Sequence, residues 1–173
     1  RMGGVQVINF AANQPQSVYT HELGHCLGFL HEHQRGDRLV NIFPCNVQGI
    51  TCSGGVPTNP GTNPYANNFP VIGSGTFWGP YDFASIMHYD RCAFSIGCPA
   101  GATCICASNQ ETMTAVQPYT AQWNTVMGNA NVPSYLDDIT CRGLYAFGGD
   151  RWLDQLSGAP SNGAFQQPYN TSF

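Results

Sequence analysis

The chain has 173 residues, a net charge of −4 and six arginines but no lysine, which argues against nucleic acid or an anionic membrane as its main partner. Its length suits one domain with a single core, or most of one, and no apolar run is long enough to span a membrane. Eight cysteines form an even and generous set, so the chain is expected to be secreted and to contain disulfides.

The first elements are expected near the N-terminus. Residues 5–10 alternate weakly between apolar and polar side chains and predict a strand. A polar turn over residues 13–17 leads into a helix that is expected from Val18 to Leu27. The apolar side chains on the back of this helix and just beyond it are expected to anchor it in the core: Leu23, Cys26, Leu27, Phe29 and Leu30.

The same helix opens the pattern H-E-x-x-H-x-x-G-x-x-H. His21 and His25 lie four residues apart and so face the same side of a helix. Gly28 can adopt a left-handed conformation and turn the chain so that His31 approaches the same point. Glu22 can hold and deprotonate a metal-bound water. H-E-x-x-H alone often arises by chance, but three of the five histidines stand at the required spacings, which predicts one Zn²⁺ bound through their Nε2 atoms.

The middle of the chain is expected to be rich in loops. Residues 45–80 contain much Gly, Pro, Asn, Thr and Ser with no sustained apolar period, which predicts a long loop region with room for one short helix and a local Cys45–Cys52 disulfide. Cys26 and Cys141 are a further plausible pair. A second loop contains four cysteines: Cys92, Cys98, Cys104 and Cys106. Disulfides are expected to hold this loop, and the C-x-C spacing of Cys104 and Cys106 leaves a second metal site as the less favoured alternative.

The C-terminal part predicts two helices and a tail. Residues 120–127 are expected to be helical, and Ser134 can cap a helix over residues 137–146. Residues 151–173, rich in Gly, Pro and Ser, form either a tail packed on the domain or the start of a linker, and the packed tail is preferred. Asn170-Thr171-Ser172 fits an N-glycosylation sequon.

A second motif lies far from the first in the sequence. Residues 85–89, Ser-Ile-Met-His-Tyr, resemble the Met-turn that lies beneath the zinc of metzincin peptidases. Together with residues 21–35 they resemble the astacin family. Glu32, directly after the third histidine, and the absence of glycine–aspartate repeats favour astacins over a serralysin-like alternative, while Tyr89 matches a tyrosine of both groups. Leu39 departs from the family, where an aspartate is usual.

The resemblance covers residues 3–147 and implies an α+β, zincin-like metzincin catalytic domain. Such a domain has an active-site helix against a twisted mixed sheet and a loop-rich C-terminal half with the Met-turn. Residues 1–150 are assigned to this domain and residues 151–173 to the C-terminal tail or linker. Family domains carry strands ahead of the zinc helix, including the edge strand that pairs with an extended substrate. We therefore expect an N-terminally incomplete domain from a longer secreted zymogen.

The resemblance also implies a secreted zinc endopeptidase that acts on protein or peptide substrates with one Zn²⁺ per chain. Glu22 would be the general base, and Tyr89 would be a fifth zinc ligand that hydrogen-bonds the oxyanion once substrate binds. Met87 would form an apolar floor under the imidazoles, while His33 and His88 are expected to be structural. Two alternatives stay open: Tyr89 as a packed core tyrosine, and the whole domain as an inactive zinc-binding adhesion or recognition module.

Overall fold

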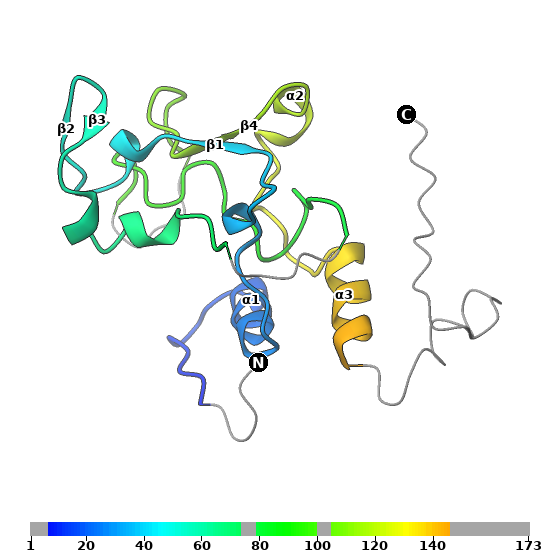
Figure 1. Ribbon diagram of the computed structural model, residues 1–173. Helices are drawn as coiled ribbons and strands as arrows, with labels where there is room; N and C mark the ends of the chain where they lie inside the picture. Colours follow the sequence, from blue (N-terminus) through cyan, green and yellow to red (C-terminus); the bar gives the residue numbers. More distant parts are fainter. Residues whose placement is uncertain (1–6, 74–78, 100–104, 146–173) are drawn as a thin grey trace.

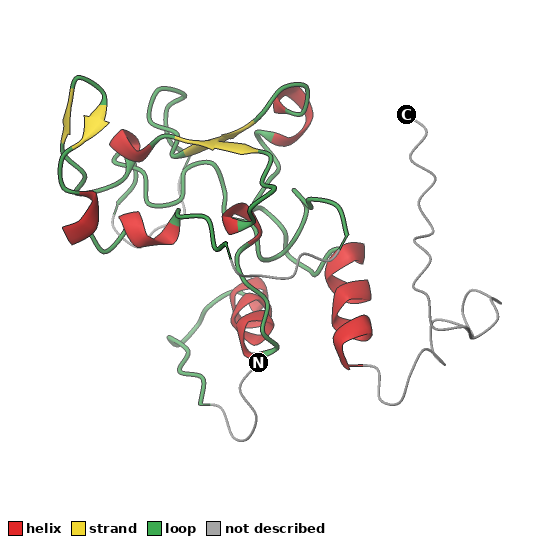
Figure 2. Ribbon diagram, viewed as in Figure 1, coloured by secondary structure: helices red, strands yellow, loops and turns green. Residues whose placement is uncertain are grey.

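The computed structural model describes residues 7–73, 79–99 and 105–145 as short helices and strands joined by long loops (Figure 1 and Figure 2). Helix α3 runs alongside α1, and the Tyr145 hydroxyl donates to the carbonyl oxygen of Leu27. In these described ranges no helix is long and apolar enough to cross a membrane. The elements in chain order are α1 (Gln16–Cys26), η1 (Glu32–Gln34), β1 (Val40–Ile42), η2 (Pro44–Asn46), β2 (Cys52–Ser53), β3 (Val56–Pro57), η3 (Pro60–Thr62), η4 (Ala66–Asn68), β4 (Met113–Ala115), α2 (Thr120–Trp123) and α3 (Tyr135–Tyr145).

The described residues form two small antiparallel sheets and not the twisted mixed sheet expected from the sequence. β1 pairs with β4 around the Asn41–Thr114 position, and β2 pairs with β3 in a short hairpin. Residues 7–10 of the expected first strand are not in a strand, and residues 5 and 6 lie outside the described ranges. Loop backbone groups are satisfied locally instead: Asn63 Oδ1 accepts from the N–H groups of Tyr65 and Ala66.

The main hydrophobic core is built on the β1–β4 pair. Aromatic rings extend this core, since Phe83 stacks on Trp123 of α2 with 5.4 Å between ring centroids, and Tyr65 stacks on Phe94 at 5.3 Å. The core therefore supports the C-terminal loops, which include residues 85–89. Its buried members are Val40, Val47, Phe69, Phe83, Met113, Ala115 and Met127.

The apolar back of α1 is exposed, so the expectation that it anchors the helix in the core is wrong. No residue of α1 is buried. The core forms on β1–β4 instead. Helix α1 contacts Met87 through Gly24, and Met87 Sδ occupies the space that a Cβ on Gly24 would need. The exposed side chains are Leu23, Leu27 and Leu30, at 50%, 36% and 51% of their area, whereas Cys26 and Phe29 are half-buried.

The first two helices follow the expected positions with different lengths. α1 spans Gln16–Cys26, close to the predicted range, and Gly28 after it has a φ of 95°, as its predicted role requires. α2 spans Thr120–Trp123, which is only half of the predicted helix over residues 120–127. The chain turns soon afterwards at Gly128, where φ is 73°.

Helix α3 begins at a capping box. Ser134 Oγ accepts from the N–H of Asp137 (2.9 Å), and Asp137 Oδ2 accepts from the N–H of Ser134 (2.9 Å). This reciprocal pair confirms Ser134 as the cap and explains why the helix starts two residues before its predicted range. The expected tail over residues 151–173 and the sequon at Asn170 lie outside the described residues.

Disulfides hold both cysteine-rich loops. The predicted Cys45–Cys52 bridge is confirmed, and a Cys92–Cys106 bridge closes the loop after residue 89. Cys98 of the same loop is also disulfide-bonded, so these described cysteines do not form a second metal site. The sulfurs of Cys26 and Cys141 are not joined to each other, and that expected pairing is wrong.

Gly128 provides a stability test of the contact behind Tyr89. Its φ is +73°, and a Cβ there would lie under 3.0 Å from Asp90 N and the Tyr89 carbonyl carbon. We expect Gly128→Ala to lower the free energy of unfolding by about 3 kcal/mol, from left-handed backbone strain plus overpacking. Gly54→Ala is the matched control, because Gly54 also has a positive φ but nothing lies within 4 Å of its Cβ position. Denaturant melts that show equal losses would contradict this interpretation.

Candidate metal centre

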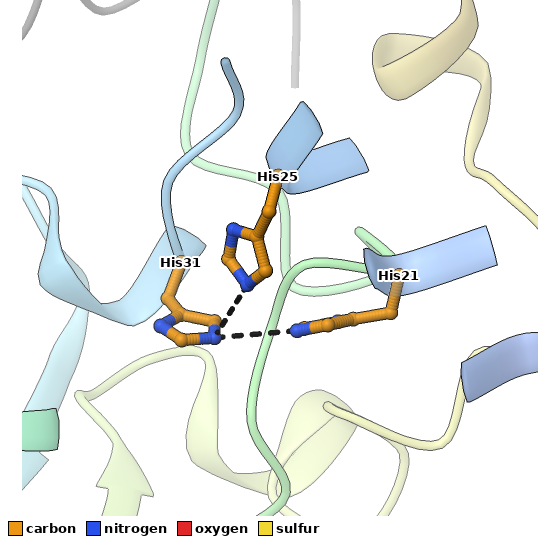
Figure 3. A group of neighbouring side chains, drawn as sticks. All are labelled: His21, His25 and His31. Atoms are coloured by element: carbon orange, nitrogen blue, oxygen red, sulfur yellow. Dashed lines mark hydrogen bonds between the residues drawn. The ribbon is translucent and has the colours of Figure 1, made fainter. Parts of the chain in front are cut away.

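Three histidines converge at the C-terminal end of α1 (Figure 3). His21 and His25 lie one turn apart on the helix, and His31 follows the turn at Gly28. The Gly28 N–H donates to the carbonyl oxygen of His25 (2.9 Å), which closes this turn. The break in the helix therefore brings a histidine from outside it to the point that two helical histidines already face.

The spacing of the ring nitrogens suits a tetrahedral metal. Nε2 of His31 lies 3.2 Å from Nε2 of His21 and 3.1 Å from Nε2 of His25. The ligand atoms of all three residues lie within 4.8 Å of one another. Two nitrogens that each sit 2.0–2.1 Å from a tetrahedral zinc would be about 3.3 Å apart. The two pairs that include His31 therefore have the spacing of ligands on one zinc ion.

The hydrogen bond made by Nδ1 fixes the tautomer of each histidine ring. Because a carbonyl oxygen only accepts, Nδ1 carries the proton in each neutral ring and the Nε2 lone pairs point at one another. Lone pairs at this separation repel unless a cation lies between them, so the donor set itself indicates a metal site. The acceptors are Ile86 O for His21 (2.7 Å), Phe29 O for His25 (2.9 Å) and Gln34 Oε1 for His31 (3.1 Å).

Burial keeps the third histidine neutral. Desolvation, together with the nearby charge of His25, lowers the pKa of His31 from 6.5 to about 4. The ring therefore holds no second proton at neutral pH, and its Nε2 lone pair is available to a cation. Metal binding to His31 then requires no proton to be displaced near neutral pH.

Tyr89 lies against the histidines, and the charge of Glu22 acts on its hydroxyl. The centroid of the Tyr89 ring is 4.3 Å from that of His31 and 4.3 Å from that of His33, on which it stacks. Burial raises the pKa of Tyr89 to about 12, and the negative charge of Glu22 adds to this rise, so the carboxylate is within electrostatic reach of the phenol. The Tyr89 hydroxyl therefore keeps its proton at neutral pH and can donate a hydrogen bond.

Asp137 fixes the segment that lies behind the histidines, and the sequence interpretation missed it as a site residue. Its Oδ1 accepts from Ser85 Oγ (2.7 Å), and its Oδ2 accepts from the Ile86 N–H (2.9 Å). The carbonyl oxygen of Ile86 then accepts from His21 Nδ1. The next residue, Met87, is 2% exposed and packs against α1. Asp137 therefore orients His21 through the backbone of a single residue, Ile86.

A cavity of about 480 Å³ lies between the loop after α1 and helix α3. At its wall Glu32 accepts from Arg35 (2.9 Å) and from the N–H of Asp82 (2.8 Å). Burial outweighs these hydrogen bonds and raises the pKa of Glu32 to about 7. Arg35 also forms an ion pair with Asp37 at 2.9 Å. This network holds the chain directly after His31 in place.

The remaining histidines have structural contacts, as expected. His33 is fully buried, and its Nε2 donates to the carbonyl oxygen of Asn68 (2.8 Å). His88 is 3% exposed, with Nε2 2.7 Å from the Tyr81 hydroxyl. Burial lowers the pKa of both imidazoles, that of His88 to about 4. Neither belongs to the histidine cluster, which in the described ranges contains only residues 21, 25 and 31.

The chain is similar in sequence to known metallopeptidases. Residues 1–53 match the family model described as Astacin (Peptidase family M12A). The mouse (Mus musculus) protein "Astacin-like metalloendopeptidase" is 38% identical over 98 residues, which cover 55% of this chain and 20% of that protein. "High choriolytic enzyme 2" of Oryzias latipes is also 38% identical over 98 residues, which cover 56% and 31%. The chain thus spans less than a third of these relatives' length.

The structure is similar to that of "High choriolytic enzyme 1", described as a hatching enzyme zinc-protease from Oryzias latipes. The TM-score is 0.55 with 30% sequence identity, and the match covers 75% of this chain and 52% of the other. Because three quarters of the chain take part, the structural likeness extends past residues 1–53 into the loop-rich part.

Proposed function

Because this chain belongs to the astacin family of peptidases, we propose that it is a secreted zinc-dependent endopeptidase acting on protein or peptide substrates. One observation carries the proposal: the Nε2 atoms of His21 and His25 lie within 3.2 Å of that of His31, at the spacing of a tetrahedral zinc site. The similar hatching enzyme, a zinc-protease, supports the same chemistry.

Zinc bound to the three histidines would supply a Lewis acid that polarises a substrate carbonyl and acidifies a water. Neutral imidazoles would leave the ion its full positive charge. Glu22 would accept the proton of that water and return it to the leaving amine. Tyr89 would be a further zinc ligand at rest and would donate a hydrogen bond from its hydroxyl to the oxyanion during hydrolysis. Its raised pKa, about 12, suits a donor at neutral pH.

Secretion is supported by the disulfides of the cysteine-rich loops, because such bonds persist in oxidising compartments. A signal peptide and a propeptide in the full-length product would agree with a secreted zymogen. The competing function is a zinc-binding recognition module without hydrolysis. The presence of Glu22 in the H-E-x-x-H motif counts against that alternative, since zinc binding alone does not need this carboxylate.

Metal removal tests the proposed function directly. We expect 1,10-phenanthroline to release about one zinc per chain and to reduce casein digestion by the activated full-length protein to background, with recovery when zinc is restored. A serine-peptidase inhibitor is the control and should leave digestion unchanged. Digestion that persists after metal analysis shows zinc to be gone would contradict the zinc mechanism. Bound zinc without any digestion would favour the recognition module.

A further inference from the structure

The three histidines differ in what holds their Nδ1 atoms. His21 and His25 face backbone carbonyl oxygens, whereas His31 faces a side-chain oxygen, Oε1 of Gln34, at 3.1 Å. A backbone carbonyl cannot be removed by substitution without moving the chain. Among the three direct Nδ1 contacts, the one with Gln34 can therefore be removed by a point mutation without moving the backbone.

Gln34 is itself firmly held. Its side chain is almost wholly buried, at 8% exposure, and it ends the η1 turn that begins directly after His31. The Gln34 N–H donates to the carbonyl oxygen of His31 (3.0 Å), and the Gln34 carbonyl oxygen accepts from the N–H of Ile72 (2.9 Å). With its backbone fixed on both sides, the amide returns to the imidazole three residues earlier.

We propose that Gln34 is a positioning residue for the metal centre: it accepts a hydrogen bond from the Nδ1–H of His31 and so keeps Nε2 unprotonated and aimed at the point shared with His21 and His25. The proposal rests on the proposed zinc site. An amide oxygen has no proton to give, so this contact selects one tautomer and one ring orientation of the imidazole. Hydrogen-bond partners of this kind typically contribute about 10–100-fold to metal affinity.

Two substitutions separate the acceptor from the packing. Gln34→Met keeps the length and most of the volume of the side chain but removes the oxygen, whereas Gln34→Glu keeps an oxygen acceptor at the same reach. The matched control is Gln48→Met. Gln48 is a half-buried glutamine whose amide donates to the carbonyl oxygens of Ser95 and Cys98 and not to a histidine. Its loss should lower stability without affecting zinc.

The zinc dissociation constant, measured by competition with a chelating dye on the full-length protein, is the first readout. We expect Gln34→Met to weaken zinc binding by about 10–100-fold, with Gln34→Glu within a few-fold of the parent or tighter. Gln48→Met should match the parent. The second readout is the ¹⁵N shift of the His31 ring in zinc-free protein, which should report a protonated Nδ1 in the parent and a mixture of tautomers in Gln34→Met.

Two outcomes would overturn the proposal. One is Gln34→Met with parental zinc affinity and an unchanged His31 tautomer. The other is equal loss of affinity in Gln34→Met and Gln34→Glu, which would assign Gln34 to packing. If Gln34→Met does not fold, Gln34→Lys replaces it, because lysine also lacks an acceptor. The proposal then requires parental zinc affinity in Gln34→Glu and weaker zinc binding in Gln34→Lys, and equal affinities would overturn it. Failure of the proposed function looks different: the parent would then bind no zinc or hydrolyse nothing, while the tautomer measurement still reports on Gln34.

Discussion

Replacing Glu22 by glutamine is expected to lower the rate constant for peptide hydrolysis by about 10²–10⁴-fold, the usual contribution of a general base. Glutamine keeps the size and the hydrogen-bonding capacity of the side chain but cannot accept a proton. Zinc content should stay near one per chain, because in the proposed site the three histidines and not Glu22 would hold the metal. Hydrolysis of a quenched fluorescent peptide by the activated full-length protein, with metal analysis of the same sample, measures both quantities.

The control for this prediction is Asp138→Asn. Asp138 pairs with Arg142 on the surface of α3, where both side chains are 49% exposed, so the variant removes one carboxylate charge away from the histidines. Its activity should equal that of the parent. A Glu22→Gln enzyme that digests as fast as Asp138→Asn would remove Glu22 from the mechanism. Loss of zinc in Glu22→Gln would instead assign Glu22 a role in holding the site.

The convergence of the three histidines was predictable because its geometry is mostly local. The period of an α-helix places His21 and His25 on one face, and one glycine conformation brings His31 to them within ten residues of chain. Gly28 has the positive φ that this interpretation required. Ser134 was predictable for the same reason, since a capping box involves neighbouring residues only.

The supports of the centre were not predictable, because they depend on tertiary packing. Asp137 reaches Ile86 across 51 residues of sequence, and its place in the first turn of α3 says nothing about that partner. The apolar back of α1 led to a wrong expectation: Leu23 and Leu27 follow a helical period typical of a buried face but remain exposed. Periodicity shows that a face is apolar, but it does not show what covers that face.

The loop-rich half was predictable in character but not in detail. Its high content of Gly, Pro and Asn correctly indicated turns, but the sequence did not indicate the three short 3₁₀ turns or the β2–β3 hairpin that the structure places there. Segments of two or three residues leave too weak a pattern for periodicity. The Cys45–Cys52 bridge was predictable because its two cysteines lie only seven residues apart.

Tyr89 has features of both a catalytic residue and a packed core residue, and an experiment can separate the two roles. Its ring stacks on His33 and lies 4.3 Å from that of His31, which suits a core aromatic. Its hydroxyl keeps a proton because burial and Glu22 raise its pKa to about 12, which suits a donor to the oxyanion. Phenylalanine preserves the stacking and removes only the hydroxyl, so Tyr89→Phe tests the two roles against each other.

If Tyr89 stabilises the oxyanion, Tyr89→Phe should lower kcat by about 10–1,000-fold and change KM much less, because the lost hydrogen bond forms mainly in the transition state. Tyr65→Phe is the matched control, since Tyr65 packs against Phe94 in the core and is expected to keep parental kinetics. Steady-state kinetics of the activated full-length protein, together with metal analysis, give the comparison. Turnover by Tyr89→Phe equal to that of Tyr65→Phe, with zinc retained, would leave Tyr89 a packing residue, and the three histidines and Glu22 would then account for the chemistry alone.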